Sequence, residues 1–142
     1  MRSMLATVYA VTTVVLAACG SDSSTDPTPT PLADNSAVVG TWNLTTINGT
    51  ALPYLVRETP KVEIVSDRFV LLADGTFTAQ LAYRVTGDGA DLVQSKRDAG
   101  TYSFSGAVAT FRFSDQTGGT AAVSGNTMTI GGSGTPFVYL KE

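Results

Sequence analysis

A regular alternation of apolar and polar side chains along residues 76–85 constrains the fold of this chain more than any other feature. Phe77, Ala79, Leu81, Tyr83 and Val85 fall on one face of an extended chain, and the positions between them are mostly polar. A period of two predicts a β-strand that buries one face only. Such a strand needs other strands to cover its apolar side.

The same alternation recurs at residues 101–104, 111–114 and 127–130. Pairs of residues that contain glycine separate these segments. They can supply the positive φ that tight hairpins need, and they are Asn48-Gly49, Asp74-Gly75, Ser105-Gly106, Gly118-Gly119 and Gly125-Asn126. We expect strands at residues 40–47, 50–56, 61–72, 76–86, 99–105, 107–114, 119–124, 127–131 and 136–141. Residues 87–97 are expected to form the longest irregular connection.

Eight or nine short strands joined in sequence by hairpins predict an all-β, antiparallel meander. No segment shows the periodicity of an amphipathic helix. An open sheet would expose two unpaired edges, and closure into a barrel removes them. A closed barrel is therefore favoured over an open sandwich.

The amino terminus has the layout of a secretory signal. A short positive start, Met1-Arg2-Ser3, precedes an apolar run over residues 4–16, and small residues end it. The run is too short to cross a bilayer as a helix. Leu16-Ala17-Ala18-Cys19 contains the single cysteine of the chain. A lone cysteine can also be a free thiol or a small buried residue, but its position at the end of the apolar run favours processing at this point.

This order of residues resembles the lipobox of bacterial lipoproteins. The resemblance implies cleavage between Ala18 and Cys19, a diacylglyceryl group on the Cys19 sulfur and acylation of the new amino terminus. Two or more acyl chains hold a protein stably at a membrane. The expected location is the bacterial cell envelope, and Gly20 in place of an Asp favours the outer membrane if the host has one.

Three regions follow from composition. Residues 1–18 are the expected signal peptide, residues 19–36 a lipidated cysteine with a disordered Ser/Thr/Pro linker, and residues 37–142 one β-domain. Pro27, Pro29 and Pro31 favour an extended linker with a reach on the order of 50 Å.

The composition argues against most enzyme chemistry. The chain has no histidine, which excludes His-based triads and His metal sites, and its one cysteine is assigned to lipid. We expect no catalytic residue, metal or cofactor, and the sparse, balanced charge shows no basic patch for nucleic acid. Most acidic residues are expected in turns or loops, bonded to nearby backbone, as for Asp67, Asp74, Asp88, Asp91, Asp98 and Asp115.

Gly40-Thr41-Trp42, Asn48-Gly49 and the Asp74-Gly75-Thr76-Phe77 hairpin resemble the lipocalin-like domain of small bacterial lipoproteins. The resemblance covers nearly all of residues 37–142. It implies that Trp42 closes the barrel floor beneath an Arg from the last strand, whereas the last strand here has no Arg.

An eight-stranded barrel is either filled by its own side chains or encloses one small ligand. Small residues expected to face inward, Ala79, Ala107, Ala109 and Ala121, can interdigitate with large ones or leave a cavity at one end, with residues 52–56 as an apolar lid. The candidate ligand contacts are Trp42, Leu52, Tyr54, Leu55, Phe77, Ala79, Leu81, Tyr83, Tyr102, Phe104, Phe111 and Phe113.

Two functions remain open. The first is a membrane-anchored binding protein for a small apolar ligand. The alternative is a non-enzymatic interaction or structural protein of the cell envelope with a filled barrel. The sequence identifies neither the ligand nor a protein partner.

Overall fold

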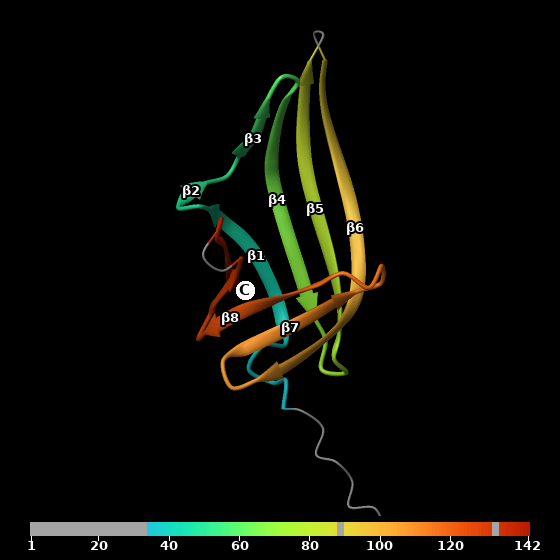
Figure 1. Ribbon diagram of the computed structural model, residues 1–142, viewed down its shortest axis with the longest axis vertical. Coiled ribbons are helices and arrows are strands. Elements are labelled where there is room, and N and C mark those ends of the chain that lie inside the picture. The colour runs from blue at the N-terminus through green and yellow to red at the C-terminus, as the bar shows by residue number, and fades with distance from the viewer. Residues whose placement is uncertain (1–33, 88–89, 132–133) are drawn as a thin grey trace, which may run out of the picture. The chain divides into compact units, whose positions relative to one another are not determined.

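The computed structural model describes residues 34–87, 90–131 and 134–142, which form ten strands and no helix. The strands are β1 (Gly40–Ile47), β2 (Thr50–Ala51), β3 (Tyr54–Glu58), β4 (Lys61–Leu71), β5 (Thr76–Gly87), β6 (Ala90–Ser105), β7 (Val108–Phe113), β8 (Gly118–Ser124), β9 (Thr127–Ile130) and β10 (Phe137–Lys141) (Figure 1). The expected signal peptide, Cys19 and the linker up to residue 33 lie outside the described residues. Residues 34–36, at the end of the expected linker, lead into a turn before β1. No helix capable of spanning a membrane occurs in the described part of the chain.

The strands follow one another in an antiparallel meander that closes on itself. Strand β1 pairs with β10 on one side and with β4 on the other, so β1 and β4 to β10 form an eight-stranded barrel. The two short strands add to it, β2 beside β1 and β3 beside β4. The all-β barrel predicted from the alternation is confirmed. The compact unit Leu32–Glu142 contains all ten strands and the whole core, which is what a domain needs to fold alone.

Strands β4, β5 and β6 continue beyond the closed part of the barrel (Figure 1). Strand β1 pairs only with residues 68–71 of β4, and β7 pairs only with residues 100–105 of β6. The remaining lengths of these strands, together with β3, form a four-stranded extension. The expectation of an irregular connection over residues 87–97 is therefore wrong, because β6 begins at Ala90. Residues 91–97 are exposed on both faces, so no burial imposes an apolar alternation on them.

Four of the five expected turns are confirmed, with positive φ at Asn48, Gly49, Gly75, Gly106 and Gly125. The fifth is wrong, since residues 118–119 belong to β8 and the turn comes earlier, at Gln116 with φ 69°. The expected strand over residues 50–56 is also interrupted, because Pro53 has no backbone N–H to donate.

Trp42 is fully buried near the start of β1. Its indole N–H donates to the Val38 carbonyl oxygen at 2.8 Å. Lys141 Nζ of the last strand lies 5.6 Å from the Trp42 ring centroid, so a lysine supplies the cation for which the resemblance implied an arginine. Gly40, at φ +136°, leaves room for this lysine, whose Cε lies only 2.9 Å from where a Cβ on Gly40 would stand.

Most of the small residues expected inside the barrel are there. Ala79, Ala109 and Ala121 are buried, whereas Ala107 is exposed because it lies in the turn between β6 and β7. Four aromatic rings pack together in the core, where the centroid of Phe69 lies 5.7 Å from that of Phe77, 5.5 Å from that of Phe111 and 5.4 Å from that of Tyr139. These centroid distances are typical of favourable aromatic pairs.

Candidate functional site

An apolar cavity of about 180 Å³ lies inside the barrel. It is lined by residues from five strands, β4 and β7 to β10, namely Phe69, Phe111, Phe113, Gly119, Ile130, Phe137 and Tyr139. Five of these seven residues are aromatic. The surface that they present is almost wholly hydrophobic, as in the pockets that proteins use for small apolar molecules.

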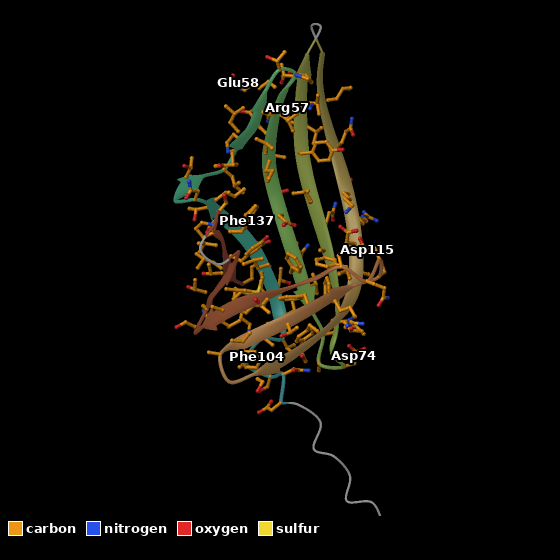
Figure 2. All side chains as sticks on the ribbon, viewed as in Figure 1. Arg57, Glu58, Asp74, Phe104, Asp115 and Phe137 are labelled. Atoms are coloured by element: carbon orange, nitrogen blue, oxygen red, sulfur yellow. The ribbon has the colours of Figure 1, made fainter. Side chains whose placement is uncertain are left out.

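The strand register shows that the cavity extends from the level of Trp42 toward the other end of the barrel. On β10, Lys141 is paired with Trp42, whereas Phe137 at the other end of the strand lines the cavity. On β4, Phe69 is paired with Trp42 and also lines the cavity, and the residues before Phe69 lead toward the extension. The cavity therefore reaches toward the end from which the four-stranded extension continues, and Figure 2 shows Phe137 near the start of β10.

Gly119 makes part of this space. It pairs directly with Phe111, whose buried ring points inward, so a side chain at position 119 would share the inner face. A Cβ built on Gly119 meets no atom within 4 Å. The missing side chain therefore leaves the cavity open at β8.

A carboxylate is hydrogen-bonded to one of the residues that line the cavity. The hydroxyl group of Tyr139, a buried lining residue, donates to Asp67 Oδ2 at 2.8 Å. Asp67 precedes Phe69 by two residues on the same face of β4, so it lies about 7 Å nearer the extension at the usual rise per strand residue. The apolar cavity and this polar pair are thus adjacent.

Burial dominates the ionisation of this pair. It raises the pKa of the Asp67 carboxyl group, against the hydrogen bonds from Tyr139 and the Arg68 backbone, and the charge of Asp98 raises it further. The pKa of the Tyr139 hydroxyl is also raised, first by burial and then by the Asp67 charge. At neutral pH Tyr139 is thus a neutral donor.

Two of the twelve candidate contacts from the sequence, Phe111 and Phe113, line the cavity. Phe77 packs edge-on against both, with centroids 5.2 Å apart in each case. The others lie elsewhere: Trp42, Ala79 and Tyr102 in the core, Leu52, Tyr54 and Phe104 partly buried against it, Leu81 and Tyr83 half-buried on β5, and Leu55 40% exposed on β3. No residue of the expected lid, 52–56, lines the cavity.

Asp67 was not anticipated as a site residue. The expectation that it lies in a turn is wrong, since it belongs to β4. Asp74 and Asp115 do bond locally, each accepting from the backbone N–H and hydroxyl of the threonine two residues later (Figure 2). Asp91 and Asp98 lie in β6, and Asp88 lies outside the described residues. The signal available in the sequence was that Asp67 keeps the parity of the apolar residues Phe69 and Leu71.

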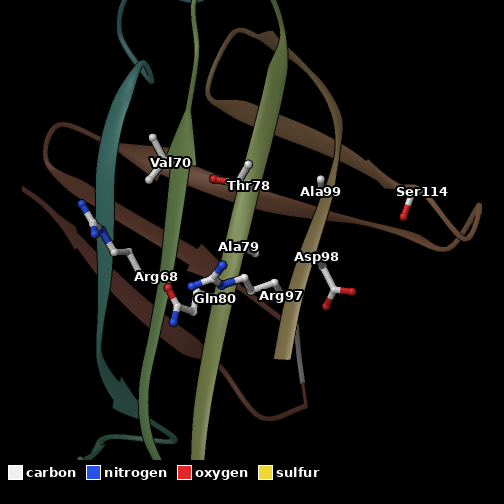
Figure 3. A pocket seen from close by; sticks show the side chains of 9 residues that line it. All are labelled: Arg68, Val70, Thr78, Ala79, Gln80, Arg97, Asp98, Ala99 and Ser114. Carbon is white, nitrogen blue, oxygen red and sulfur yellow. The ribbon is translucent and has the colours of Figure 1, made fainter. Parts of the chain in front are cut away.

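A second, polar hollow of about 570 Å³ lies on the outer face of β4 to β6. Arg68, Gln80 and Arg97 stand there in one cross-strand row. Figure 3 shows Arg97 reaching toward Gln80, while Arg68 extends the other way toward β1. These exposed side chains do not converge on a common point. Residues 34–87, 90–131 and 134–142 also contain no cluster of three acidic, His or Cys side chains that could hold a metal ion.

Comparison with known proteins identifies the family. A family model described as a lipocalin-like domain matches residues 38–133, more than half of the 142-residue chain and all strands from β1 to β9. Neither the curated proteins nor the solved structures yielded a match. The closed antiparallel barrel, its buried Trp42 and this match agree, and the chain belongs to the lipocalin-like domain family.

Proposed function

We propose that this protein binds one small hydrophobic molecule inside its barrel and performs no covalent chemistry on it. The observation that supports this most strongly is the apolar cavity of about 180 Å³ between Phe69, Phe111 and Gly119. Cavities of about 150 Å³ lined by apolar side chains stay dry and bind benzene or xenon. The available space therefore suits a molecule of about one aromatic ring.

The affinity for such a small molecule is modest. Seven or eight non-hydrogen atoms at well under the ceiling of about 1.5 kcal/mol each give a dissociation constant on the order of 0.1–1 mM. A natural ligand that also contacts the half-buried Leu81 and Tyr83 of the extension would bind more tightly.

Toluene tests this proposal on the isolated unit Leu32–Glu142. Saturable NMR shifts are expected at residues around the cavity. In Gly119→Leu the new side chain fills the space next to Phe111, and affinity is expected to fall at least tenfold. Thr120→Leu is the matched control, because it adds the same side chain on the exposed face of the same strand. Equal binding by wild type and Gly119→Leu, or none by wild type, would contradict the proposal.

We also propose that the protein is exported and held at the cell envelope by acyl chains on Cys19, at the outer membrane where the host has one. The lipobox supports this. Metabolic labelling of the full chain with an alkyne fatty acid should modify the wild type, and intact mass should show a chain beginning at Cys19. Cys19→Ser should lose the label and keep residues 1–18, whereas Ser21→Ala should behave as wild type. A labelled Cys19→Ser chain would refute the anchor.

The alternative, an interaction protein of the envelope, is favoured by apolar side chains exposed on the extension. Val56, Leu92 and Val93 are 56%, 57% and 63% exposed. If the wild-type cavity binds no small molecule, this outer surface becomes the better-supported functional region.

A further inference from the structure

The carboxylate of Asp67 has no cationic partner among the described residues. The ion pairs there are Lys61 with Glu63, Arg84 with Glu63, and Lys96 with Asp98 at 3.0 Å. Arg68 follows Asp67 on β4 and points to the opposite face of the sheet. Asp67 therefore has a neutral donor, the Tyr139 hydroxyl, and no positive charge to neutralise it.

A partly buried carboxylate without a counter-ion is an unusual group, because taking a charge out of water is costly unless it is paired. An incoming cation would supply the missing partner. An incoming anion would be repelled by Asp67 and by Asp98, whose charge also acts on the Asp67 carboxyl group. A neutral molecule would gain only the apolar contacts.

The cavity itself adds to this preference. The rings of Phe69, Phe111, Phe113 and Phe137 surround it, and aromatic faces attract cations as well as apolar groups. The Tyr139 side chain joins the two parts of the site, because it lines the cavity and its hydroxyl group bonds to Asp67. A ring in the cavity that carries a charged group one or two bonds away could direct that group toward the Tyr139–Asp67 pair.

We propose that the cavity selects small amphipathic amines, with the apolar body among the rings and the ammonium group paired with Asp67. This inference rests on the proposed function, since it names the ligand class of the same cavity.

Three probes of nearly equal size test it on the unit Leu32–Glu142: benzylammonium, benzyl alcohol and benzoate. Wild type is expected to bind benzylammonium about tenfold more tightly than benzyl alcohol, and benzoate most weakly. Asp67→Asn should remove the preference and keep the affinity for benzyl alcohol within about twofold. Asp67→Glu should retain the preference, and Asp91→Asn, which removes an exposed charge from β6, should leave it unchanged.

The outcomes separate the two proposals. Equal affinity of wild type for all three probes, with binding abolished by Gly119→Leu, would overturn the selection of amines and leave the cavity function intact. Loss of benzyl alcohol binding in Asp67→Asn would give Asp67 a structural role and would also overturn it. If no probe binds wild type, the proposed function fails.

Discussion

Asp67 carries its charge on the inner face of β4, two residues from Phe69. Two effects on its ionisation compete there. The Tyr139 hydroxyl and the Arg68 backbone favour the carboxylate, while burial and the charge of Asp98 favour the neutral acid. Burial prevails, so the folded protein holds the proton of Asp67 more tightly than the unfolded chain does.

Asp67→Asn is therefore expected to stabilise the protein at neutral pH. With its pKa raised in the folded state, Asp67 makes the native protein bind more protons than the unfolded chain, so the free energy of unfolding falls as pH rises through the folded pKa. Asparagine avoids this loss. Urea unfolding, followed by the fluorescence of the single tryptophan, Trp42, should give Asp67→Asn the higher midpoint at pH 7.

The advantage should shrink below the ordinary aspartate pKa of about 3.9, where both states of the wild type are protonated. Every other ionisable group is the same in the two proteins, so the difference between them isolates Asp67. A lower midpoint for Asp67→Asn at pH 7 would mean that the charged hydrogen bond from Tyr139 outweighs burial.

Asp67 was missed as a site residue because Ser66-Asp67-Arg68 has the composition of a turn, although the expected strand over residues 61–72 includes it. The aromatic residues were easier to place. Phe111 and Phe113 were expected at the ligand site and do line the cavity. Phe137 and Tyr139 were missed, although they alternate in the last strand in the same way.

At the scale of the strands, prediction succeeded where one face is buried. Strand β1 matches the expected residues 40–47, and β5 extends one residue beyond the expected 76–86. It failed for the first half of β6, where neither face is covered. It also failed at Gly118, where the glycine serves a close approach: a Cβ would lie 2.7 Å from the Phe111 carbonyl oxygen. Sequence alone does not separate such a glycine from a turn glycine.

Gly100 tests the close packing of β6 on β7. A Cβ there would overlap the carbonyl oxygen of Arg112 and lie 2.9 Å from Phe77 Cε1. Because backbone cannot move aside cheaply, Gly100→Ala should cost about 2–4 kcal/mol of unfolding free energy. Gly119→Ala, where a Cβ meets nothing within 4 Å, should stay within about 1 kcal/mol of wild type. Urea unfolding curves with similar losses for both variants would contradict the strand packing.

At the scale of the whole molecule, closure of the barrel was predicted because unpaired strand edges need protection. The pairing of β1 with both β4 and β10 closes the barrel and so protects these edges. Whether the interior is filled could not be predicted. The buried Ala79, Ala109 and Ala121 were the obvious candidates for empty space, yet none of them lines the cavity. The space appears instead at Gly119, because the volume left inside a barrel depends on how side chains from different strands pack together.

The central claim is that this space stays open to a small apolar guest. A crystal structure of the unit Leu32–Glu142 under xenon pressure tests it most directly. We predict xenon density between Phe69, Phe111 and Gly119 in the wild type, and none there in Gly119→Leu. A wild-type interior without xenon, with the surrounding rings moved together to fill it, would contradict the account.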